Sequence, residues 1–213
     1  MKQVHGANID SALETDFQQL KAQLHAVGVE LHGAWIESLW DYARLLCRWA
    51  QKMNLVSAGD VTKIFTKHIG PACVMVSIVQ SVRHRSIVDY GSGAGLPGIP
   101  LKIALPDSIV YLVESRRKRA SFLSTVVREL GLSKVEVVNR RLQEWCCPSG
   151  PVDLVVSRAV AGARLADEVR THLAPNGIIL TSSATSTGQQ NLPHAGTRFE
   201  FSGFPTVVMF PAR

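Results

Sequence analysis

Residues 87–101 read IVDYGSGAGLPGIPL, a short β-branched run that leads into a turn with four glycines. A strand-forming run directly before glycines predicts a β-strand that ends in a tight turn. In a doubly wound α/β sheet such a turn lies at the carboxyl ends of the strands, where these folds bind ligands. Glycines there allow unusual backbone angles and let the chain approach a ligand closely. The stretch therefore predicts an α/β fold with a glycine-rich ligand loop.

Downstream of this loop, strand-like and helix-like segments alternate. Short β-branched runs predict strands at residues 87–88, 109–113, 135–138, 154–156 and 178–180, with helices at 99–105, 116–130 and 163–173. This alternation is typical of parallel β-α-β units. Two more short strands, at 199–201 and 206–210, are expected to complete a seven-stranded, mostly parallel sheet. The segment 181–198, rich in Ser, Thr, Gly and Gln, predicts a mobile loop.

Residues 1–85 contain no obvious strand and predict a helical N-terminal lobe. We expect a domain boundary after this lobe, with residues 86–213 forming the α/β domain. Ser11 and Glu14 make a capping-box pattern, so the first helix is expected to begin near them. Gly28 follows the last apolar residue at helical spacing and is expected to end that helix.

Two further helices are expected in this lobe. An apolar stripe containing three tryptophans predicts a helix from Trp35 to Met53, and such a stripe is more often core than a binding surface. A third helical segment starts near Asp60. It is expected to bend or break at Gly70–Pro71, because proline disrupts a helix interior.

The composition is that of a soluble globular protein, with 46% hydrophobic and 19% charged residues. No apolar run is long enough to span a bilayer, and acidic residues fall where a signal peptide would be apolar. We therefore expect a cytoplasmic monomer with no membrane association. Cys47 and Cys73 lie in apolar stretches, and Cys146–Cys147 are adjacent, which suits neither a zinc site nor an ordinary disulfide. No metal site is predicted.

The net charge of +6 and the pI near 9.4 indicate an acidic partner. Residues 116–119 read Arg-Arg-Lys-Arg, a run of four cations. Phosphate backbones are bound mainly by such side chains, although a solvated helix face would look the same. Arg116, Arg117 and Arg119 are therefore candidate contacts to a nucleic acid, together with Lys67 in the N-terminal lobe.

The spacing of the glycine loop leaves its ligand open. Gly93 to Gly98 satisfies the G-x-G-x-x-G pattern of dinucleotide sites, but no Gly-Lys-Ser/Thr follows, which excludes a P-loop. Asp89 beside the loop would repel a pyrophosphate and would suit the ammonium and sulfonium of S-adenosylmethionine. Glu114, at the end of the second strand, can accept hydrogen bonds from ribose hydroxyls in either case. These residues favour S-adenosylmethionine over NAD as the ligand. A third interpretation is that the glycines bind no ligand and only let a helix pack closely on a strand.

The segment from Asp89 to Leu101 resembles the GidB/RsmG family of bacterial 16S rRNA guanine-N7 methyltransferases. Further blocks in the same order resemble that family: Tyr42, Leu45, Leu46, Trp49, Asn54-Leu55, His68-Ile69, Glu114-Ser115, Lys118-Arg119, Phe122-Leu123, Glu129 to Leu132, and Ser157 to Ala161. The resemblance covers about residues 39 to 180. It implies a Rossmann-like class I methyltransferase that uses S-adenosylmethionine and acts on 16S rRNA or the small ribosomal subunit.

The resemblance also implies which residues hold the cofactor. They are Gly91, Ser92, Gly93, Gly95 and Leu96 in the loop, Glu114 at the ribose, Leu142 and Gln143 at the adenine, and Arg158 beside the methyl group. Arg158 could instead be a structural partner of Asp153. Guanine N7 already carries an in-plane lone pair, so no general base is needed and no catalytic residue is expected beyond alignment of the reactants.

Three positions depart from the family pattern. Gly70–Pro71 replaces an aspartate that usually follows the histidine block, and Gln143 replaces a glutamate. Leu180 to Ser183 stands where the family has Lys-Gly after the fifth strand, and that lysine is of a kind that would contact RNA. An alternative function is therefore a cofactor-binding relative with weak or lost activity that serves as an RNA-binding or ribosome-assembly protein.

Overall fold

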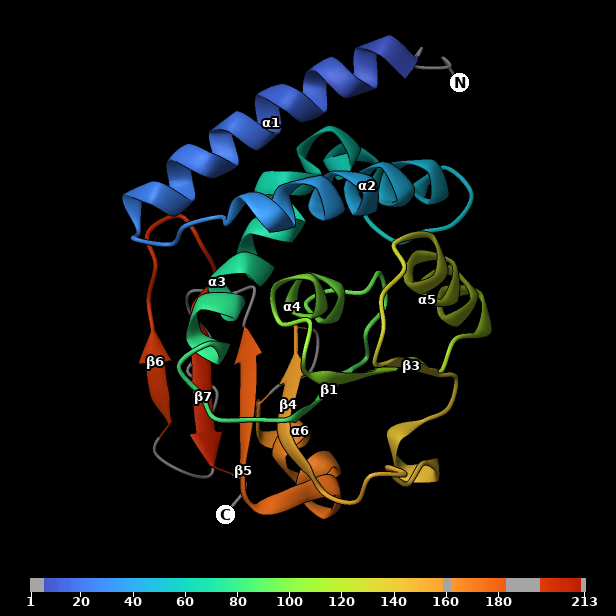
Figure 1. Ribbon diagram of the computed structural model, residues 1–213, viewed down its shortest axis with the longest axis vertical. Coiled ribbons are helices and arrows are strands. Elements are labelled where there is room, and N and C mark those ends of the chain that lie inside the picture. The colour runs from blue at the N-terminus through green and yellow to red at the C-terminus, as the bar shows by residue number, and fades with distance from the viewer. Residues whose placement is uncertain (1–5, 159–161, 183–195, 212–213) are drawn as a thin grey trace.

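The computed structural model describes residues 6–158, 162–182 and 196–211 (Figure 1). Its strands are β1 (Ser86–Tyr90), β2 (Ile109–Val113), β3 (Val135–Val138), β4 (Val152–Ser157), β5 (Leu173–Ser182), β6 (Thr197–Phe199) and β7 (Val207–Pro211). They form one seven-stranded sheet in the order β3-β2-β1-β4-β5-β7-β6. Strands β1 to β5 pair in parallel, and β7 is antiparallel to both of its neighbours. The predicted seven-stranded, mostly parallel sheet is confirmed.

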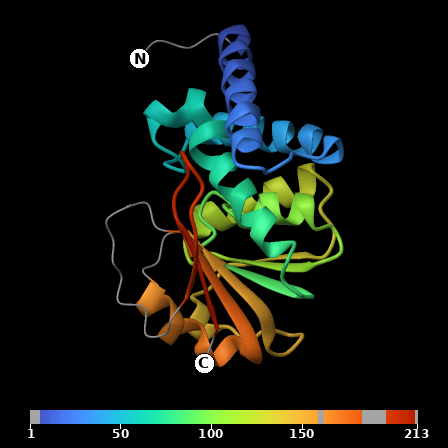
Figure 2. The same cartoon turned by 90° about the vertical axis from the view of Figure 1, so that its left-hand side faces the viewer.

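Helices cover both faces of this sheet (Figure 2). The α-helices are α1 (Gly6–Ala26), α2 (Gly33–Ala50), α3 (Gly70–Val79), α4 (Gly98–Ala104), α5 (Arg117–Glu129) and α6 (Gly162–Val169). Short 3-10 helices are η1 (Ala58–Lys63), η3 (Leu142–Glu144) and η4 (Arg170–His172), and η2 (Phe65–Ile69) is a π-helix. Helices α1 to α5 lie on one side of the sheet and α6 lies on the other (Figure 2).

Side-chain alternation along β1 explains how the two faces are filled. Ile87 belongs to the apolar cluster under α1 to α5, and Val88 belongs to the cluster under α6. Successive residues of a strand point to opposite faces, so Asp89 faces α4 and Tyr90 faces α6. The first cluster runs without interruption from Leu13 in α1 to Leu180 in β5. The helical lobe and the sheet thus share a core, and the division into domains at residue 85 stays a prediction.

The first helix begins earlier than the capping-box pattern predicted. Helix α1 already starts at Gly6, and the Ser11 carbonyl accepts a hydrogen bond from the Thr15 hydroxyl (3.1 Å) inside the helix. Ser11 is therefore no cap, because the helical residues before it extend the helix toward the N-terminus. The predicted stop is confirmed: Gly28 has a φ of 72°, which favours glycine.

Of the bend or break expected at Gly70–Pro71, the break is wrong. Gly70 has helical angles (φ −56°, ψ −50°), so the backbone continues from the π-helix η2 directly into α3. What changes there is the helix type. Pro71 falls in the first turn of α3, a position where proline is tolerated because its angle suits a helix start.

Several segment boundaries also differ from the prediction. Thr181 and Ser182 belong to β5, and Thr197 and Arg198 belong to β6, so the ends of the expected loop are strands. Residues 183–195 lie outside the described residues, and the predicted mobility falls there. The expected helix at 163–173 ends as α6 at Val169, and η4 follows.

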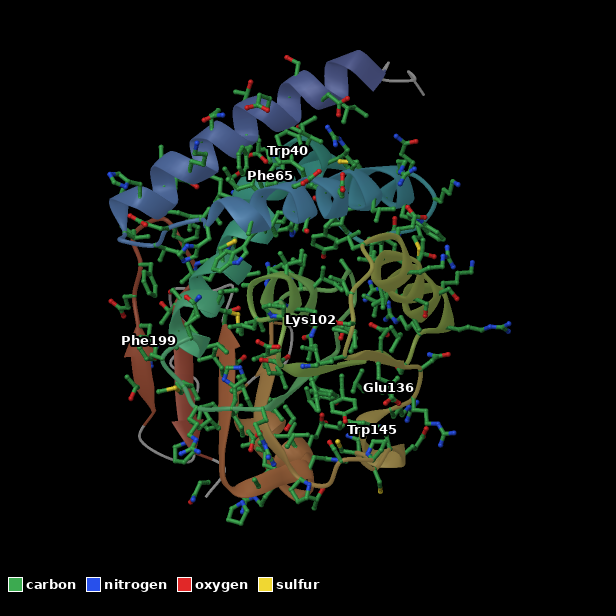
Figure 3. The ribbon with its side chains drawn as sticks, viewed as in Figure 1. Trp40, Phe65, Lys102, Glu136, Trp145 and Phe199 are labelled. Atoms are coloured by element: carbon green, nitrogen blue, oxygen red, sulfur yellow. The ribbon has the colours of Figure 1, made fainter. Side chains whose placement is uncertain are left out.

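Three aromatic rings join the helices of the lobe. Phe17 of α1, Trp40 of α2 and Phe65 of η2 have ring centroids 4.9 to 5.4 Å apart, and Figure 3 labels the last two. Tilted and edge-on ring pairs at this separation are favourable beyond the area that they bury. The tryptophan-rich stripe of α2 thus contributes to the core, as predicted.

We expect replacement of Asp16 by alanine to lower the free energy of unfolding by about 2–3 kcal/mol. This buried carboxylate of α1 accepts hydrogen bonds from the Phe65 amide (2.7 Å) and the Thr66 hydroxyl (2.6 Å) at the start of η2. Its loss would leave the amide and the hydroxyl without their acceptor. Urea unfolding measures the change. Asp10→Ala is the control, since its exposed ion pair with Arg44 (3.8 Å) should contribute less than about 1 kcal/mol. Equal midpoints for the two variants would contradict the prediction.

Candidate functional site

The glycine loop is anchored on the end of β2. The amides of Gly91 and Ser92 both donate to the Val113 carbonyl, at 3.0 and 3.1 Å. Gly91, Gly93 and Gly95 have φ values of 73°, 57° and 90°. Side chains rarely adopt these angles, so the loop needs its glycines to turn back over the carboxyl ends of the strands.

Asp89 lies beneath the loop. Its side chain is fully buried, and its Oδ2 accepts a hydrogen bond from the Gly98 amide at the start of α4 (3.0 Å). Among the described residues its Oδ1 has no hydrogen-bond partner. The sequence argument placed this carboxylate beside a bound cofactor, whereas the structure shows that it joins β1 to α4. The Asp89 side chain therefore stabilises the conformation of the loop between β1 and α4.

Burial raises the pKa of Asp89 to about 7, against the opposing effect of its hydrogen bonds with Ser92 and Gly98. An aspartate in an unfolded chain loses its proton near pH 4. Between about pH 4 and pH 7 the native state therefore binds more protons, and stability from this group falls as the pH rises.

We expect Asp89→Asn to flatten this pH dependence, because an amide does not titrate in that window. The measurement is urea unfolding of the cofactor-free protein at several pH values from 5 to 8, with the exposed Asp10→Asn as the control. Wild type and the control should lose stability with rising pH more steeply than Asp89→Asn. Parallel curves for all three proteins would refute the assignment.

Glu114 connects the glycine loop to the start of α5. Its buried carboxylate accepts hydrogen bonds from the Gly93 amide through Oε2 (3.0 Å) and from the Arg116 amide through Oε1 (2.7 Å). Each carboxylate oxygen has a second lone pair, so both can accept a further hydrogen bond from a ligand hydroxyl. The predicted ribose contact is therefore compatible with this geometry.

A cavity of about 470 Å³ opens next to Glu114 at the carboxyl ends of β1, β2 and β3. Its lining consists of Tyr90, Gly91, Val113, Glu114, Ser115, Arg140, Arg141, Leu142, Gln143 and Glu168. The structure thus brings together four of the predicted cofactor residues: Gly91, Glu114, Leu142 and Gln143. The volume is in the range of small-molecule sites.

The other predicted loop residues do not reach the surface of this cavity. Ser92, Gly93, Gly95 and Leu96 are buried and do not line it. A Cβ atom on Gly95 would lie 2.6 Å from Cγ1 of Ile99, so this glycine allows the loop to pack closely on α4.

Sequence reasoning missed two pairs in the cavity. The Tyr90 hydroxyl donates a hydrogen bond to the Glu168 carboxylate, which joins the end of β1 to α6. Arg140 and Arg141, exposed after β3, form part of the lining. The position of Tyr90 at the end of a predicted strand could have indicated its place. Nothing in the sequence pattern indicates Glu168, because its position depends on how α6 packs on the sheet.

Arg158, directly after β4, connects the sheet with the helical lobe. Its Nη1 donates to the His68 carbonyl in η2 (2.9 Å). The predicted alternative, in which Arg158 pairs with Asp153, is wrong. The Asp153 carboxylate accepts hydrogen bonds from the amides of Arg85 (2.8 Å) and Ser86 (3.0 Å) instead. Arg158 does not line the 470 Å³ cavity, so its predicted place beside the methyl group stays a prediction.

The candidate nucleic-acid contacts fall into two places. Arg116 and Arg117 are exposed at the start of α5, directly after the cavity residue Ser115. Arg119 is half-buried, and its guanidinium donates to the Asn54 carbonyl (3.2 Å), which makes it a link to the helical lobe. Lys67 is exposed on η2 and lines a different groove.

The comparisons with known proteins agree on one family. A family model described as GidB, rRNA small subunit methyltransferase G, matches residues 35–207. The chain belongs to the GidB family. It is 37% identical over 182 residues to ribosomal RNA small subunit methyltransferase G of Desulfitobacterium hafniense, which covers 83% of this chain and 75% of that protein. The protein of the same name from Yersinia enterocolitica is 38% identical over 144 residues, 68% of each chain.

Solved structures support the fold. A SAM-dependent methyltransferase from Aquifex aeolicus superposes with a TM-score of 0.53 at 16% identity, covering 76% of this chain and 96% of that one. Precorrin-6y C5,15-methyltransferase from Geobacter metallireducens gives a TM-score of 0.50 at 14% identity, over 73% and 89% of the two chains. The predicted Rossmann-like methyltransferase fold is confirmed, and at this identity the likeness shows the fold alone.

The strongest departure from the family pattern lies inside β5. Thr181 pairs with Ser157 of β4 and with Val208 of β7, and Ser182 pairs with Val207. Both Thr181 and Ser182 are buried. The position expected to carry an RNA-contacting lysine is thus part of the sheet in this GidB protein, and Ser183 lies outside the described residues.

The remaining sequence expectations concern metals, thiols and membranes. Within residues 6–158, 162–182 and 196–211, no group of His, Cys, Asp and Glu is arranged to hold a metal ion. Cys47, Cys73, Cys146 and Cys147 are free thiols, and the first two are buried. No helix in the described part of the chain is long and apolar enough to cross a membrane.

Proposed function

We propose that this protein transfers a methyl group from S-adenosylmethionine to N7 of a guanine in 16S ribosomal RNA. Membership of the GidB family is the observation that carries this proposal. The 470 Å³ cavity at the carboxyl ends of β1 to β3 supports it, because it joins a carboxylate, a glycine turn and a short 3-10 segment in one small-molecule site. We further infer that the protein acts as a monomer in the cytoplasm on rRNA or a small-subunit particle.

The residues of the cavity suit S-adenosylmethionine. Glu114 provides acceptors for the two ribose hydroxyls, while Leu142 and Gln143 in η3 border the place for the adenine. Gly91 lets the backbone approach the ligand, since nothing lies within 4 Å of where its Cβ would be. The sulfonium of the bound cofactor supplies an activated methyl group, so the protein has only to align N7 with it and to exclude water.

The guanine must be presented from outside a regular helix. N7 lies in the deep major groove of paired RNA, which side chains reach poorly, so an unpaired or remodelled loop is the suitable target. Arg116 and Arg117 lie next to the cavity and can hold the phosphates of that loop.

We expect Arg116→Gln/Arg117→Gln to weaken RNA binding and to reduce its salt slope by about 1 to 2 units. Each phosphate contact releases counterions from the RNA on binding, so a protein with fewer contacts releases fewer of them. Arg119 is left in place because it bonds to Asn54 within the protein. Fluorescence anisotropy over a salt series measures both quantities. Arg83→Gln/Arg85→Gln removes the same charge directly before β1, at the amino ends of the strands and so on the side away from the cavity. The control Arg83→Gln/Arg85→Gln should keep the wild-type slope. If Arg116→Gln/Arg117→Gln also keeps it, Arg116 and Arg117 do not contact RNA.

A methyl-transfer assay tests the proposed function. Small subunits and naked 16S rRNA from cells that lack the gene are incubated with the protein and methyl-labelled S-adenosylmethionine. Label at a single guanine, recovered as 7-methylguanine, is the expected result, and the preferred substrate distinguishes RNA from particle. Incorporation elsewhere, or none in either substrate, would refute the activity.

One observation favours a second candidate function. The buried strand residues Thr181 and Ser182 stand where the family pattern has Lys-Gly, so the RNA side of the site is altered while the cofactor cavity is intact. The protein would then bind the cofactor and RNA without efficient transfer and would serve ribosome assembly. Tight cofactor binding with no labelled guanine is the outcome that would support this alternative.

A further inference from the structure

A second groove lies between the helical lobe and the turn that precedes β7. It encloses about 490 Å³ and is lined by residues of α1, by the end of η1, by η2, by Pro71 and by residues 203–206. Figures 1 and 2 show how the segment between β6 and β7 rises from the sheet toward the helices of the lobe. Two parts of the chain that are distant in sequence thus build one surface.

This groove lies near the carboxyl ends of the strands that the cofactor cavity does not cover. Thr206 in its lining directly precedes Val207, which pairs with Ser182 at the carboxyl end of β5. Lys67 in its lining directly precedes His68, whose carbonyl accepts the hydrogen bond of Arg158 at the end of β4. The groove is therefore adjacent to the carboxyl ends of β4 and β5, whereas the cavity lies over β1 to β3.

The charge of the groove is positive. Lys63 and Lys67 line it and are exposed, and its lining contains no acidic residue. Two carboxylates lie close to these lysines: Asp16 is buried and accepts hydrogen bonds from the Phe65 amide and the Thr66 hydroxyl, and Asp60, whose charge interacts with that of Lys67, pairs with His68 (3.3 Å). The two ammonium groups are thus available to a phosphate.

An aromatic ring and two prolines supply the apolar part of the groove. The Phe204 ring packs against Gly70, where a Cβ atom would lie 3.0 Å from its Cε1. Pro205, which is half-buried, and Pro71, which is buried at the start of α3, also line the groove. Unpaired bases stack on such surfaces, and stacking is largely independent of base identity.

We propose that this groove binds one nucleotide of single-stranded RNA that flanks the target guanine. Lys63 and Lys67 bind its phosphate, and Phe204 stacks on its base. The proposal rests on the proposed function, because it assigns the groove to the same RNA. It also explains how the chain can hold RNA without a lysine after β5: the cations come from η1 and η2 of the helical lobe.

The first test removes the two charges. A labelled single-stranded oligonucleotide that spans the methylated guanine is titrated against Lys63→Gln/Lys67→Gln, with Lys21→Gln/Lys134→Gln as the charge-matched control. We expect about tenfold weaker binding and a salt slope lower by about 0.7 for the first variant, the value for one single-strand phosphate contact, and no change for the control. Calorimetry should give wild-type affinity for S-adenosylmethionine in both.

The second test removes the stacking surface. Phe204→Leu keeps an apolar side chain of similar size and should weaken oligonucleotide binding about tenfold while leaving the salt slope unchanged. Thermal unfolding confirms that the variant is folded. Equal affinities for Phe204→Leu, the lysine variant and wild type would overturn the proposal. So would variants that bind the oligonucleotide normally but lose the small subunit, because the groove would then contact ribosomal protein. These binding results do not depend on methyl transfer, so failure of the proposed function is seen separately in the labelling assay.

Discussion

Replacement of Glu114 by alanine is expected to weaken the binding of S-adenosylmethionine at least about 100-fold. Two hydrogen bonds from ribose hydroxyls to a carboxylate are together worth about 3 kcal/mol or more, which is that factor in affinity. The same carboxylate accepts the amides of Gly93 and Arg116, so its loss also loosens the glycine loop and the start of α5. Isothermal titration calorimetry on the purified variant measures the change directly.

Glu136→Ala is the matched control for this prediction. Glu136 is an exposed glutamate on the neighbouring strand β3 and is labelled in Figure 3. Its replacement removes the same charge and should leave the affinity unchanged.

A 2′-deoxyribose analogue of S-adenosylhomocysteine separates the direct contact from the effect on the loop. Wild type should bind it more weakly than S-adenosylhomocysteine, and Glu114→Ala should bind both equally. If the folded variant still discriminates between the two ligands, Glu114 does not contact the ribose.

The helical lobe makes hydrogen bonds to the glycine loop and to residues that follow two other strands. The Tyr42 hydroxyl of α2 donates to the Ala94 carbonyl in the glycine loop (2.6 Å). Arg119 bonds to the Asn54 carbonyl, and Arg158 bonds to the His68 carbonyl. Each contact joins the lobe to the end of a strand or to the residues that follow it. The shape of the loop therefore depends on the packing of α2 as well as on its glycines, while η2 holds Arg158 after β4.

The parts of the fold that follow from local chemistry were predictable. The run before Gly91 and the alternating segments after it gave the parallel strands, because β-branched runs and glycine turns act within a few residues. The position of Glu114 beside the cavity could be predicted for the same reason, since ligands bind at the carboxyl ends of parallel strands. Local patterns were weaker at helix ends: the capping-box pattern at Ser11 did not mark the start of α1.

The parts that depend on tertiary packing were not predictable. Asp153 was the one protein partner considered for Arg158, and only the placement of η2 shows that Arg158 bonds the His68 carbonyl instead. Asp89 was expected beside a ligand, but the side of β1 on which it lies places it under α4. The groove lined by Lys63 and Phe204 joins segments about 140 residues apart, and no spacing rule connects them.

Replacement of Gly98 by alanine is expected to lower the free energy of unfolding by about 2–5 kcal/mol. A Cβ atom at this position would lie 2.4 Å from Cδ2 of Leu112, 2.5 Å from Oδ2 of Asp89 and 2.9 Å from Cβ of Asp89. All of these atoms belong to fully buried side chains, so none of them can move into solvent. The displaced Asp89 carboxylate would lose the Gly98 amide and remain buried without that hydrogen bond.

Urea unfolding tests this prediction against two glycine controls. Gly59→Ala places its methyl group in open space and should change stability by less than about 1 kcal/mol. Gly91→Ala also meets no neighbour, but its φ of 73° should cost about 1–2 kcal/mol. A Gly98→Ala variant within about 1 kcal/mol of wild type would contradict the prediction.

The double variant Gly98→Ala/Leu112→Ala identifies the cause of the loss. If steric overlap with Leu112 contributes, removing that side chain makes room for the new methyl group, and the double variant loses less stability than the sum of the two single variants. The contact with Asp89 persists in the double variant, so the recovery should be partial. Simple additivity would mean that the overlap with Leu112 is relieved by a shift of α4, and the strain would then have to lie at Asp89 alone.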